Sequence, residues 1–280
     1  MRTDGLTPAA ATGREALDAA AVRAAVLRPG GLWRAIDVTD VTGSTNADLL
    51  ALASGGAPEG LVLAAEQQRA GRGRMGRAWV APPRAALTFS LLLRPQAVPR
   101  ARHGWLPLLA GLATAEAVRS VTPVDARLKW PNDVLVGAAK LGGILTEAAS
   151  GAVVVGIGLN VSTEPDELPP PGPGALPATS LRIAASPGPD RGVLLAAILT
   201  GFERGYRAWT RAFGDPERSG LGADYTRLCS TIGQRVRVEL PGGGLLTGLA
   251  TGVDQDGRLL VRTGPDAELP VAAGDVVHLR

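Results

Sequence analysis

KWPND at residues 129–133 is followed at hairpin distance by KLGG at residues 140–143. Together the two segments supply two lysines, an amide and a carboxylate. A lysine ammonium binds phosphate as a point charge, and the carboxylate of Asp133 suits a magnesium ion that bridges phosphates. The spacing is not that of a P-loop, and the Lys-x-Asp-Gly pattern of covalent nucleotidyl transferases is absent. Alone, the segment would be interpreted as a surface hairpin with solvated lysines, so its meaning depends on the rest of the chain.

An arginine-rich stretch precedes it, centred on GRGRMGR at residues 71–77 and free of acidic residues between Glu66 and Glu116. The segment matches G-x-G-x-x-G. A dinucleotide-binding turn, however, opens a helix and has an acidic residue about twenty positions later, whereas here prolines follow at positions 82 and 83. Alternating glycine and arginine instead favours close approach of the backbone to an anion, with guanidinium groups on either side. The alternative is a solvated basic surface.

Two shorter segments add polar groups. GSTN at residues 43–46 places hydroxyls and an amide at a predicted helix start, where they either cap the helix or bind a polar ligand head. GIGLNV at residues 156–161 is an apolar strand that ends in the amide of Asn160. Neither segment is informative by itself.

Hydrophobic periodicity predicts an α+β chain. We expect helices over residues 16–27, from a cap at Ser44 or Thr45 to residue 54, over 105–121 and over 190–213. We expect strands over residues 33–39, 60–66, 86–94, 128–136, 143–148 and 152–161, then a proline-rich loop over 164–178. From residue 231 the period changes to two, with turns at residues 241–244 and 254–257, which predicts a small β-barrel. The expected parts are an N-terminal tail with one helix (1–30), an α+β domain (31–229) and the barrel (230–280).

Composition limits the function classes. With 280 residues, 45% of them hydrophobic, the chain can bury a substantial core. A single cysteine, Cys229, excludes an intrachain disulfide framework and a multi-cysteine zinc site, and two histidines leave little for metal chemistry. No apolar run is long enough for a membrane span, and acidic residues near the N-terminus argue against a signal peptide. The expected compartment is the cytoplasm, without membrane attachment.

Together and in this order, the four segments resemble the biotin protein ligase family from residue 42 to residue 181. The arginine-glycine loop followed by KWPND-x6-KLGG carries the resemblance, because chance occurrence of both at this spacing is remote. The resemblance implies a mixed-sheet catalytic domain of the biotin/lipoate ligase type, similar to class II synthetases, with a C-terminal SH3-like β-barrel. It also implies a ligase that forms biotinyl-5′-AMP from biotin and ATP and transfers the biotin to a lysine of an acceptor protein.

The family's site residues correspond to positions of this sequence. The resemblance assigns catalysis to Arg72, Arg74 and Lys140, which would neutralise the carboxylate of biotin and the α-phosphate. It assigns biotin binding to Ser44, Thr45, Asn46, Gln68, Gly71, Arg72, Gly73, Arg74, Lys140 and Gly143. It assigns ATP binding to Arg74, Arg77, Trp79, Lys129, Asn132, Lys140 and Asn160, and the Mg²⁺ that accompanies ATP to Asp133.

The implied partner is a biotin carboxyl carrier domain of a biotin-dependent carboxylase. We expect it on another chain, because a carrier's lysine lies between two methionines and no methionine here adjoins a lysine. Some family members also act as repressors through an N-terminal helix-turn-helix domain. Barely forty residues precede the ligand motif here, so we expect no binding to nucleic acid. Met75 departs from the family pattern, since relatives often have a basic residue there.

Two other functions stay open. A lipoate ligase or octanoyl transferase would share the catalytic fold, and octanoyl transferases commonly use a cysteine or lysine nucleophile. Cys229 is the only cysteine and falls at the predicted domain junction. An arginine-glycine binder of nucleic acid would have repeated RG units with interleaved aromatic residues, whereas this chain has one such cluster and 4% aromatic residues.

Overall fold

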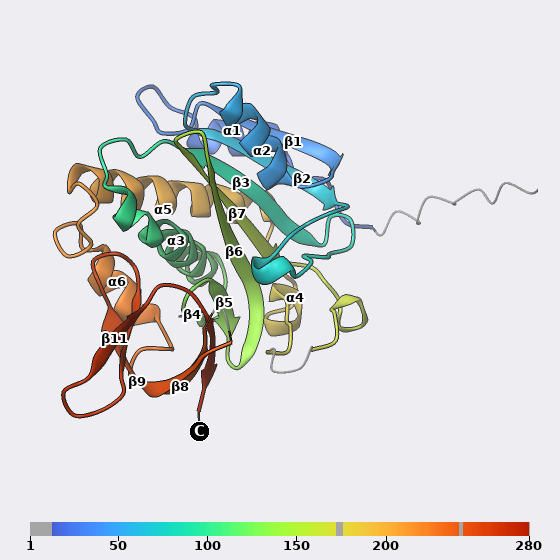
Figure 1. Ribbon diagram of the computed structural model, residues 1–280. Helices are drawn as coiled ribbons and strands as arrows, with labels where there is room; N and C mark the ends of the chain where they lie inside the picture. The colour runs from blue at the N-terminus through green and yellow to red at the C-terminus, as the bar shows by residue number, and fades with distance from the viewer. Residues whose placement is uncertain (1–12, 172–175, 241–242, 280) are drawn as a thin grey trace, which may run out of the picture.

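The computed structural model describes residues 13–171, 176–240 and 243–279 (Figure 1). Within these ranges, seven strands form a sheet in the order β1-β2-β3-β7-β6-β5-β4. β1 and β2 are parallel and the other neighbours are antiparallel, so the predicted mixed sheet is confirmed. The strands are β1 (Ala35–Thr42), β2 (Leu61–Gln68), β3 (Ala86–Leu93), β4 (Ala126–Lys129), β5 (Asp133–Val136), β6 (Ala139–Ala149) and β7 (Ala152–Asn160).

Helix α2 (Thr45–Ser54) makes the crossover between the parallel strands β1 and β2. It begins where the sequence predicts, because the hydroxyl of Ser44 accepts a hydrogen bond from the amide of Ala47 and caps the first turn. α2 packs on β2, β3, β6 and β7. Its first turn lies against the middle of the sheet, where the side chain of Asn46 meets Leu145 and Gly156.

The opposite face of the sheet is covered by α1 (Ala19–Val26), α3 (Trp105–Val121) and α5 (Arg191–Arg211). Every residue of β3 is buried, because its side chains alternate between two covered faces. Leu91 joins the core under α3 and α5, whereas Leu92 packs with Leu49 of α2. None of the helices within the described ranges is long and apolar enough to cross a membrane.

The N-terminal helix is confirmed as α1, capped by the side chain of Asp18. Residues 1–12 of the predicted tail lie outside the described residues. The segment before α1 is held by acidic groups of the α+β domain: Arg14 pairs with Glu167 at 2.5 Å, and the amide of Leu17 donates to Glu66. The carboxylate of Glu66 is almost fully buried and also pairs with Arg191 at 2.6 Å. The N-terminal segment is therefore part of the packed domain.

The single strand predicted for residues 128–136 is wrong. The chain instead forms two antiparallel strands, β4 and β5, joined by a turn that contains the cis bond between Trp130 and Pro131. Both strands are half-buried and mix apolar with charged residues, so hydropathy alone does not separate them, and the proline marks the break because it cannot continue a hydrogen-bonded ladder. The hairpin places Lys129 opposite Asp133.

After α6 (Leu221–Leu228), the C-terminal strands form a five-stranded antiparallel sheet in the order β11-β10-β9-β8-β12. The period of two predicted for residues 235–239 is confirmed, since Val236 and Val238 are buried and their neighbours are exposed. Part of the predicted turn at residues 241–244 lies outside the described residues, and the likeness to an SH3 barrel stays a prediction. The strands are β8 (Arg235–Glu239), β9 (Leu245–Val253), β10 (Leu259–Arg262), β11 (Glu268–Val271) and β12 (Asp275–His278).

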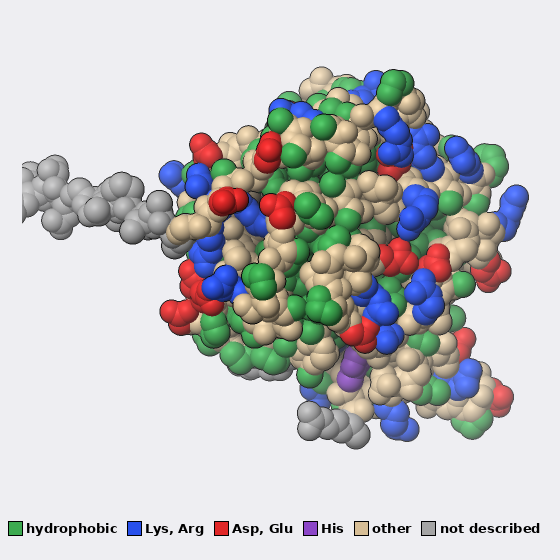
Figure 2. Space-filling model, turned by 180° about the vertical axis from the view of Figure 1, so that it is seen from behind, with side chains coloured by type: hydrophobic (Ala, Val, Ile, Leu, Met, Phe, Trp, Pro, Cys, Tyr) green, Lys and Arg blue, Asp and Glu red, His purple; other side chains and the backbone are tan. Residues whose placement is uncertain are grey.

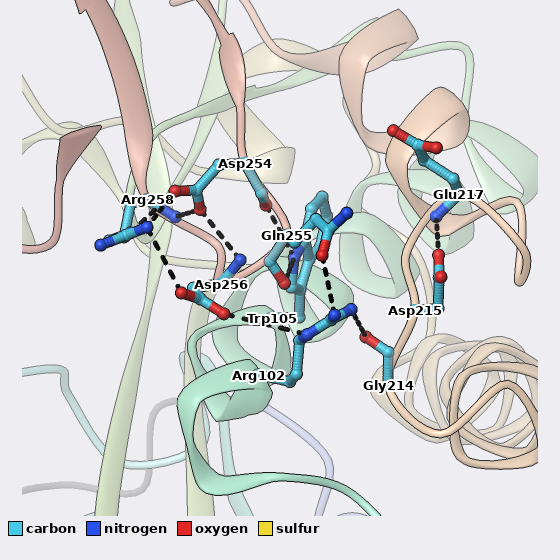
Figure 3. A network of polar contacts seen from close by, with 9 residues as sticks. All are labelled: Arg102, Trp105, Gly214, Asp215, Glu217, Asp254, Gln255, Asp256 and Arg258. Atoms are coloured by element: carbon cyan, nitrogen blue, oxygen red, sulfur yellow. Dashed lines mark hydrogen bonds and ion pairs between the residues drawn. The ribbon is translucent and has the colours of Figure 1, made fainter. Parts of the chain in front are cut away.

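The turn between β9 and β10 joins the C-terminal sheet to the start of α3 (Figure 3). The indole N–H of Trp105 donates to the carbonyls of Asp254 and Gln255, both at 3.1 Å. The indole of Trp130 donates to the carbonyl of Gly257, also at 3.1 Å. Gly104 is required because a Cβ there would lie 2.2 Å from the carbonyl oxygen of Asp256. Two buried indoles therefore fix the C-terminal sheet against the α+β domain.

We expect Trp105→Phe to lower the free energy of unfolding by about 1–2 kcal/mol more than Trp209→Phe does. Both indoles are buried, and both changes remove a similar volume. Only the first leaves two carbonyls without their donor, because the indole nitrogen of Trp209 has no hydrogen-bond partner. Urea unfolding monitored by far-ultraviolet circular dichroism measures both variants, and equal losses would contradict the prediction.

Candidate active site

A cavity of about 570 Å³ opens on the α2 side of the sheet. Its floor is formed by β3, β6 and β7, and its walls by the arginine-glycine loop, the β4–β5 turn and β12 of the C-terminal sheet. Every site residue predicted from the sequence lines this cavity except Gly71. Gly71 lies behind it, where a Cβ would come within 2.5 Å of the carbonyl oxygen of Trp79. The fold thus brings together residues that are far apart in the chain.

At one end of the cavity, a chain of hydrogen bonds joins neutral side chains and ends at the carboxylate of Glu147. The side-chain oxygen of Gln68 accepts from the amide and the hydroxyl of Thr45, at 2.8 and 3.0 Å. The Thr45 hydroxyl also contacts that of Ser90 at 2.7 Å, and Ser90 donates to Asn46 at 2.6 Å. The amide nitrogen of Asn46 donates to Glu147 at 2.7 Å. Each side chain holds the next, so the polar groups at this end are fixed in orientation.

Two glycines of β7 make room for the side chains above the sheet. A Cβ on Gly156 would lie 2.2 Å from the side-chain oxygen of Asn46, and one on Gly158 would lie 2.5 Å from the ring of Trp79. The apolar strand GIGLNV thus has its glycines on the cavity side, where a larger residue would displace a site residue. At its end, the side-chain amide of Asn160 donates to the carbonyl of Thr179 at 3.0 Å.

The arginine-glycine loop folds back on itself over the cavity. Residues 72 and 78 form an isolated antiparallel bridge, and the amide of Gly73 donates to the carbonyl of Arg77 at 2.7 Å. Met75 is exposed at the tip in a left-handed conformation, with φ of 55°. After the loop, Trp79 enters the cavity wall, and its indole nitrogen is buried without a hydrogen-bond partner. A ligand acceptor would satisfy that donor.

The other end of the cavity is cationic. Arg74, Arg77, Lys129 and Lys140 line it. Burial lowers the pKa of Arg74 and of Lys129, and the nearby cations Arg77 and Lys140 contribute to the shift at Lys129. On the molecular face shown in Figure 2, basic side chains are interspersed with acidic ones. The cavity therefore concentrates half-buried positive charge of the kind that binds a polyanion.

Three of these four cations have a side-chain partner: Lys140, Arg74 and Arg77. Lys140 pairs with Asp133 at 2.6 Å, Arg74 donates to the side-chain oxygen of Asn132 at 3.2 Å, and Arg77 pairs with Asp275. Lys140 lies on β6, and its backbone also bonds to residue 177 of the proline-rich loop and to residue 179 just after it. Residues 172–175 of that loop lie outside the described residues. The partners hold the cations in place around one volume.

Asp133 meets only part of what a metal site needs. Its Oδ1 atom is buried and makes no hydrogen bond besides the ion pair with Lys140. Within the described residues, no group of three or more Asp, Glu, His or Cys side chains is placed to hold a metal ion. Magnesium commonly takes one or two protein carboxylates and completes its octahedron with water and substrate phosphate. The carboxylate fits a magnesium ion that arrives with a nucleotide.

The sequence did not predict two residues that support the cavity from behind, or the residues of β12 that line it. Ser90 is fully buried within the hydrogen-bond chain, and its signal was a hydroxyl, like that of Thr88, inside the otherwise apolar run of β3. Glu147 bonds to Asn46 and lies 3.8 Å from Arg72. The residues of β12 carried no local signal. Cys229, considered as a nucleophile, is buried beside β4 and does not line the cavity.

Comparison with known proteins identifies the family. Residues 38–164 match the model of the biotin/lipoate A/B protein ligase family, and residues 231–279 match the biotin protein ligase C-terminal domain. A Mycobacterium tuberculosis protein named biotin–[acetyl-CoA-carboxylase] ligase is 45% identical over 271 residues, covering 95% of this chain and 97% of that protein. The chain belongs to the biotin protein ligase family.

Other members of the biotin protein ligase family are also similar to this chain in sequence or in structure. The bifunctional ligase/repressor BirA of Bacillus subtilis is 35% identical over 230 residues, which are 80% of this chain and 68% of that protein. The Aquifex aeolicus biotin protein ligase in complex with biotin and ATP superposes with a TM-score of 0.71 at 26% identity, covering 89% of this chain and 100% of that chain. The predicted α+β fold is thereby confirmed, and the lipoate alternative gains no support.

We expect Lys129→Met to stabilise the ligand-free protein at neutral pH. The pKa of Lys129 in the folded chain lies below its ordinary value of 10.5, so the folded state disfavours the ammonium. That cost is present at neutral pH and disappears as the pH rises through the lowered pKa towards 10.5. The stability gain should therefore shrink in the same range.

Thermal unfolding of wild type, Lys129→Met and Lys129→Arg at several pH values measures this effect. The arginine variant is the matched control, because it keeps the charge. A methionine variant that is less stable than wild type at pH 7 would contradict the prediction.

Proposed function

We propose that this chain forms biotinyl-5′-AMP from biotin and ATP, and then transfers the biotin to a lysine of an acceptor protein. The observation that carries the proposal is a single cavity with a neutral, hydrogen-bonding end and a cationic end. Biotin has the same two parts, a neutral ureido ring and a carboxylate, and ATP brings the phosphates. Membership of the biotin protein ligase family supports the assignment.

The neutral end suits the ring of biotin. Thr45 lines the cavity with a hydroxyl that both donates and accepts, and Gln68 and the buried Ser90 hold that hydroxyl in orientation. A ureido group has one carbonyl oxygen and two N–H groups, so it needs at least one donor and two acceptors from the protein, and the hydroxyls and side-chain amides at this end supply both kinds. Gly143 lies close to Lys140, since a Cβ there would be 3.3 Å from the ammonium, so the biotin tail would reach the cations past a residue without a side chain.

Adenylation joins two anions, which repel each other. The cations at the other end of the cavity would reduce that repulsion. A carboxylate oxygen of biotin attacks the α-phosphorus of ATP; the new O–P bond forms as the bond to the β-phosphate oxygen breaks and pyrophosphate leaves. Arg72, Arg74 and Lys140 would neutralise the carboxylate and α-phosphate, with Arg77 and Lys129 on the other phosphates. Positioning and charge account for the catalysis without a covalent enzyme intermediate.

The adenine would lie near Trp79 and Asn160, with Asn132 beside them. All three line the cavity, and the free indole N–H of Trp79 offers a donor to the nucleotide. Mg²⁺ would be held by Asp133 and would supply further charge neutralisation on the phosphates. The arginine-glycine loop, which covers this end, would exclude water from the mixed anhydride.

In the transfer step, the amine of the acceptor lysine attacks the biotinyl carbonyl. The C–N bond forms, AMP departs with the electron pair of the broken C–O bond, and the amine loses a proton to solvent. The acceptor would be the biotin carboxyl carrier domain of a carboxylase, on another chain. We place the reaction in the cytoplasm, where ATP is present and a single unpaired cysteine stays reduced.

The test is biotin-dependent ATP–pyrophosphate exchange on the purified protein. We expect exchange with biotin and none with lipoate or octanoate. Lys140→Ala and Arg74→Ala should each lower the rate by roughly two to three orders of magnitude, the loss typical of removed electrostatic donors.

Arg100→Ala is the matched control, because Arg100 belongs to the same acid-free stretch but is exposed away from the cavity. It should exchange at the wild-type rate. Exchange with lipoate or octanoate alone, or no exchange with any acid, would overturn the proposed function.

A further inference from the structure

The C-terminal sheet supplies one wall of the cavity. Asp275, Val276 and Val277 of β12 line it, although the motifs that identify the site all precede residue 165. Asp275 is one of two charged residues of this wall; the other, Glu239 of β8, pairs with Arg237 at 3.6 Å. Asp275 faces the arginine-glycine loop, which lies almost 200 residues earlier in the chain.

The carboxylate of Asp275 lies among the cations. It accepts a hydrogen bond from the guanidinium of Arg77 and forms an ion pair with it. Burial lowers the pKa of Arg74, and among the neighbouring charges Asp275 opposes that shift most strongly. Asp275 also raises the pKa of Lys129, in opposition to the lowering by burial. One carboxylate is thus close to three of the groups expected to bind phosphate.

The position of Asp275 is set by the C-terminal sheet and not by the loop. β12 pairs with β8, with Asp275 opposite Glu239. At the other end of β12, His278 contacts the hydroxyl of Thr231 at 3.1 Å, and that hydroxyl accepts from the amide of Trp130 at 3.1 Å. The carboxylate is therefore held at a fixed place relative to the β4–β5 turn, and the exposed side chain of Arg77 reaches out to it.

We propose that Asp275 is a positioning residue that serves as the counter-ion of Arg77 until a phosphate replaces it. The inference rests on the proposed function, because ATP is the anion that displaces it. Without nucleotide, the ion pair holds the arginine-glycine loop against the C-terminal sheet. When ATP enters, Arg77 exchanges the carboxylate for phosphate oxygens, and the negative charge of Asp275 opposes nucleotide binding.

Asp275→Asn should lower the KM for ATP about two- to fivefold, the range that a partly exposed ion pair supports. The kcat and the KM for biotin should not change. In an Arg77→Gln background the same substitution should have a smaller effect, because the ion pair through which Asp275 mainly acts is already absent. Damage to the fold would instead raise both KM values and lower kcat.

Glu268→Gln is the matched control. It removes an equal charge from the same sheet, where Glu268 pairs with Arg262 outside the cavity. It should leave the KM for ATP unchanged and so separate a local effect from a change in net charge.

Hydrogen–deuterium exchange of the ligand-free protein gives a readout independent of activity. Amides of residues 71–78 should exchange faster in Asp275→Asn than in wild type and Glu268→Gln. Unchanged exchange in that segment, or a KM for ATP that does not fall, overturns the proposal. If wild type shows no biotin-dependent activity, the proposed function fails by itself, and the exchange of residues 71–78 still decides whether Asp275 holds the loop.

Discussion

Gathering several cations around one half-buried volume is the constraint on which the rest of the structure depends. Like charges repel, and burial disfavours the charged forms of Arg74 and Lys129. Carboxylates from separate elements partly compensate this charge: Asp133 of β5 pairs with Lys140, and Asp275 of β12 pairs with Arg77. A site arranged this way is ready for an anion but carries unfavourable charge without one, as binding sites commonly do.

The sheet is built to present that site on one face. The face covered by α1, α3 and α5 contains most of the buried apolar residues, whereas on the α2 face a cavity takes the place of part of the packing. Gly156 and Gly158 lie at the cavity, and each lacks a side chain at the place that Asn46 or Trp79 occupies. The hydrogen-bond chain beneath α2 runs from Gln68 to the carboxylate of Glu147, and each member is held by the next, which makes this end of the site rigid.

The C-terminal sheet belongs to the same structural unit as the site. Its buried residues join the main core, and the indoles of Trp105 and Trp130 donate into the turn between β9 and β10. Trp130 adjoins Lys129, so the contact that docks the sheet also fixes a wall of the cavity. The domain boundary near residue 229, predicted from the change in periodicity, stays a prediction, and the segments on its two sides share this interface.

The sequence by itself determined the local elements and the chemistry. The cap at Ser44, the helix over residues 105–121 and the alternation in β8 follow from short-range preferences, and the spacing of the glycine, arginine and lysine motifs pointed to phosphate and to the family. Only the tertiary structure decided that residues 128–136 form a hairpin, that Ser90 and Glu147 complete the polar chain, and that Asp275 faces Arg77. These contacts join segments far apart in the chain, and neither periodicity nor a local motif records which distant strand a side chain will meet.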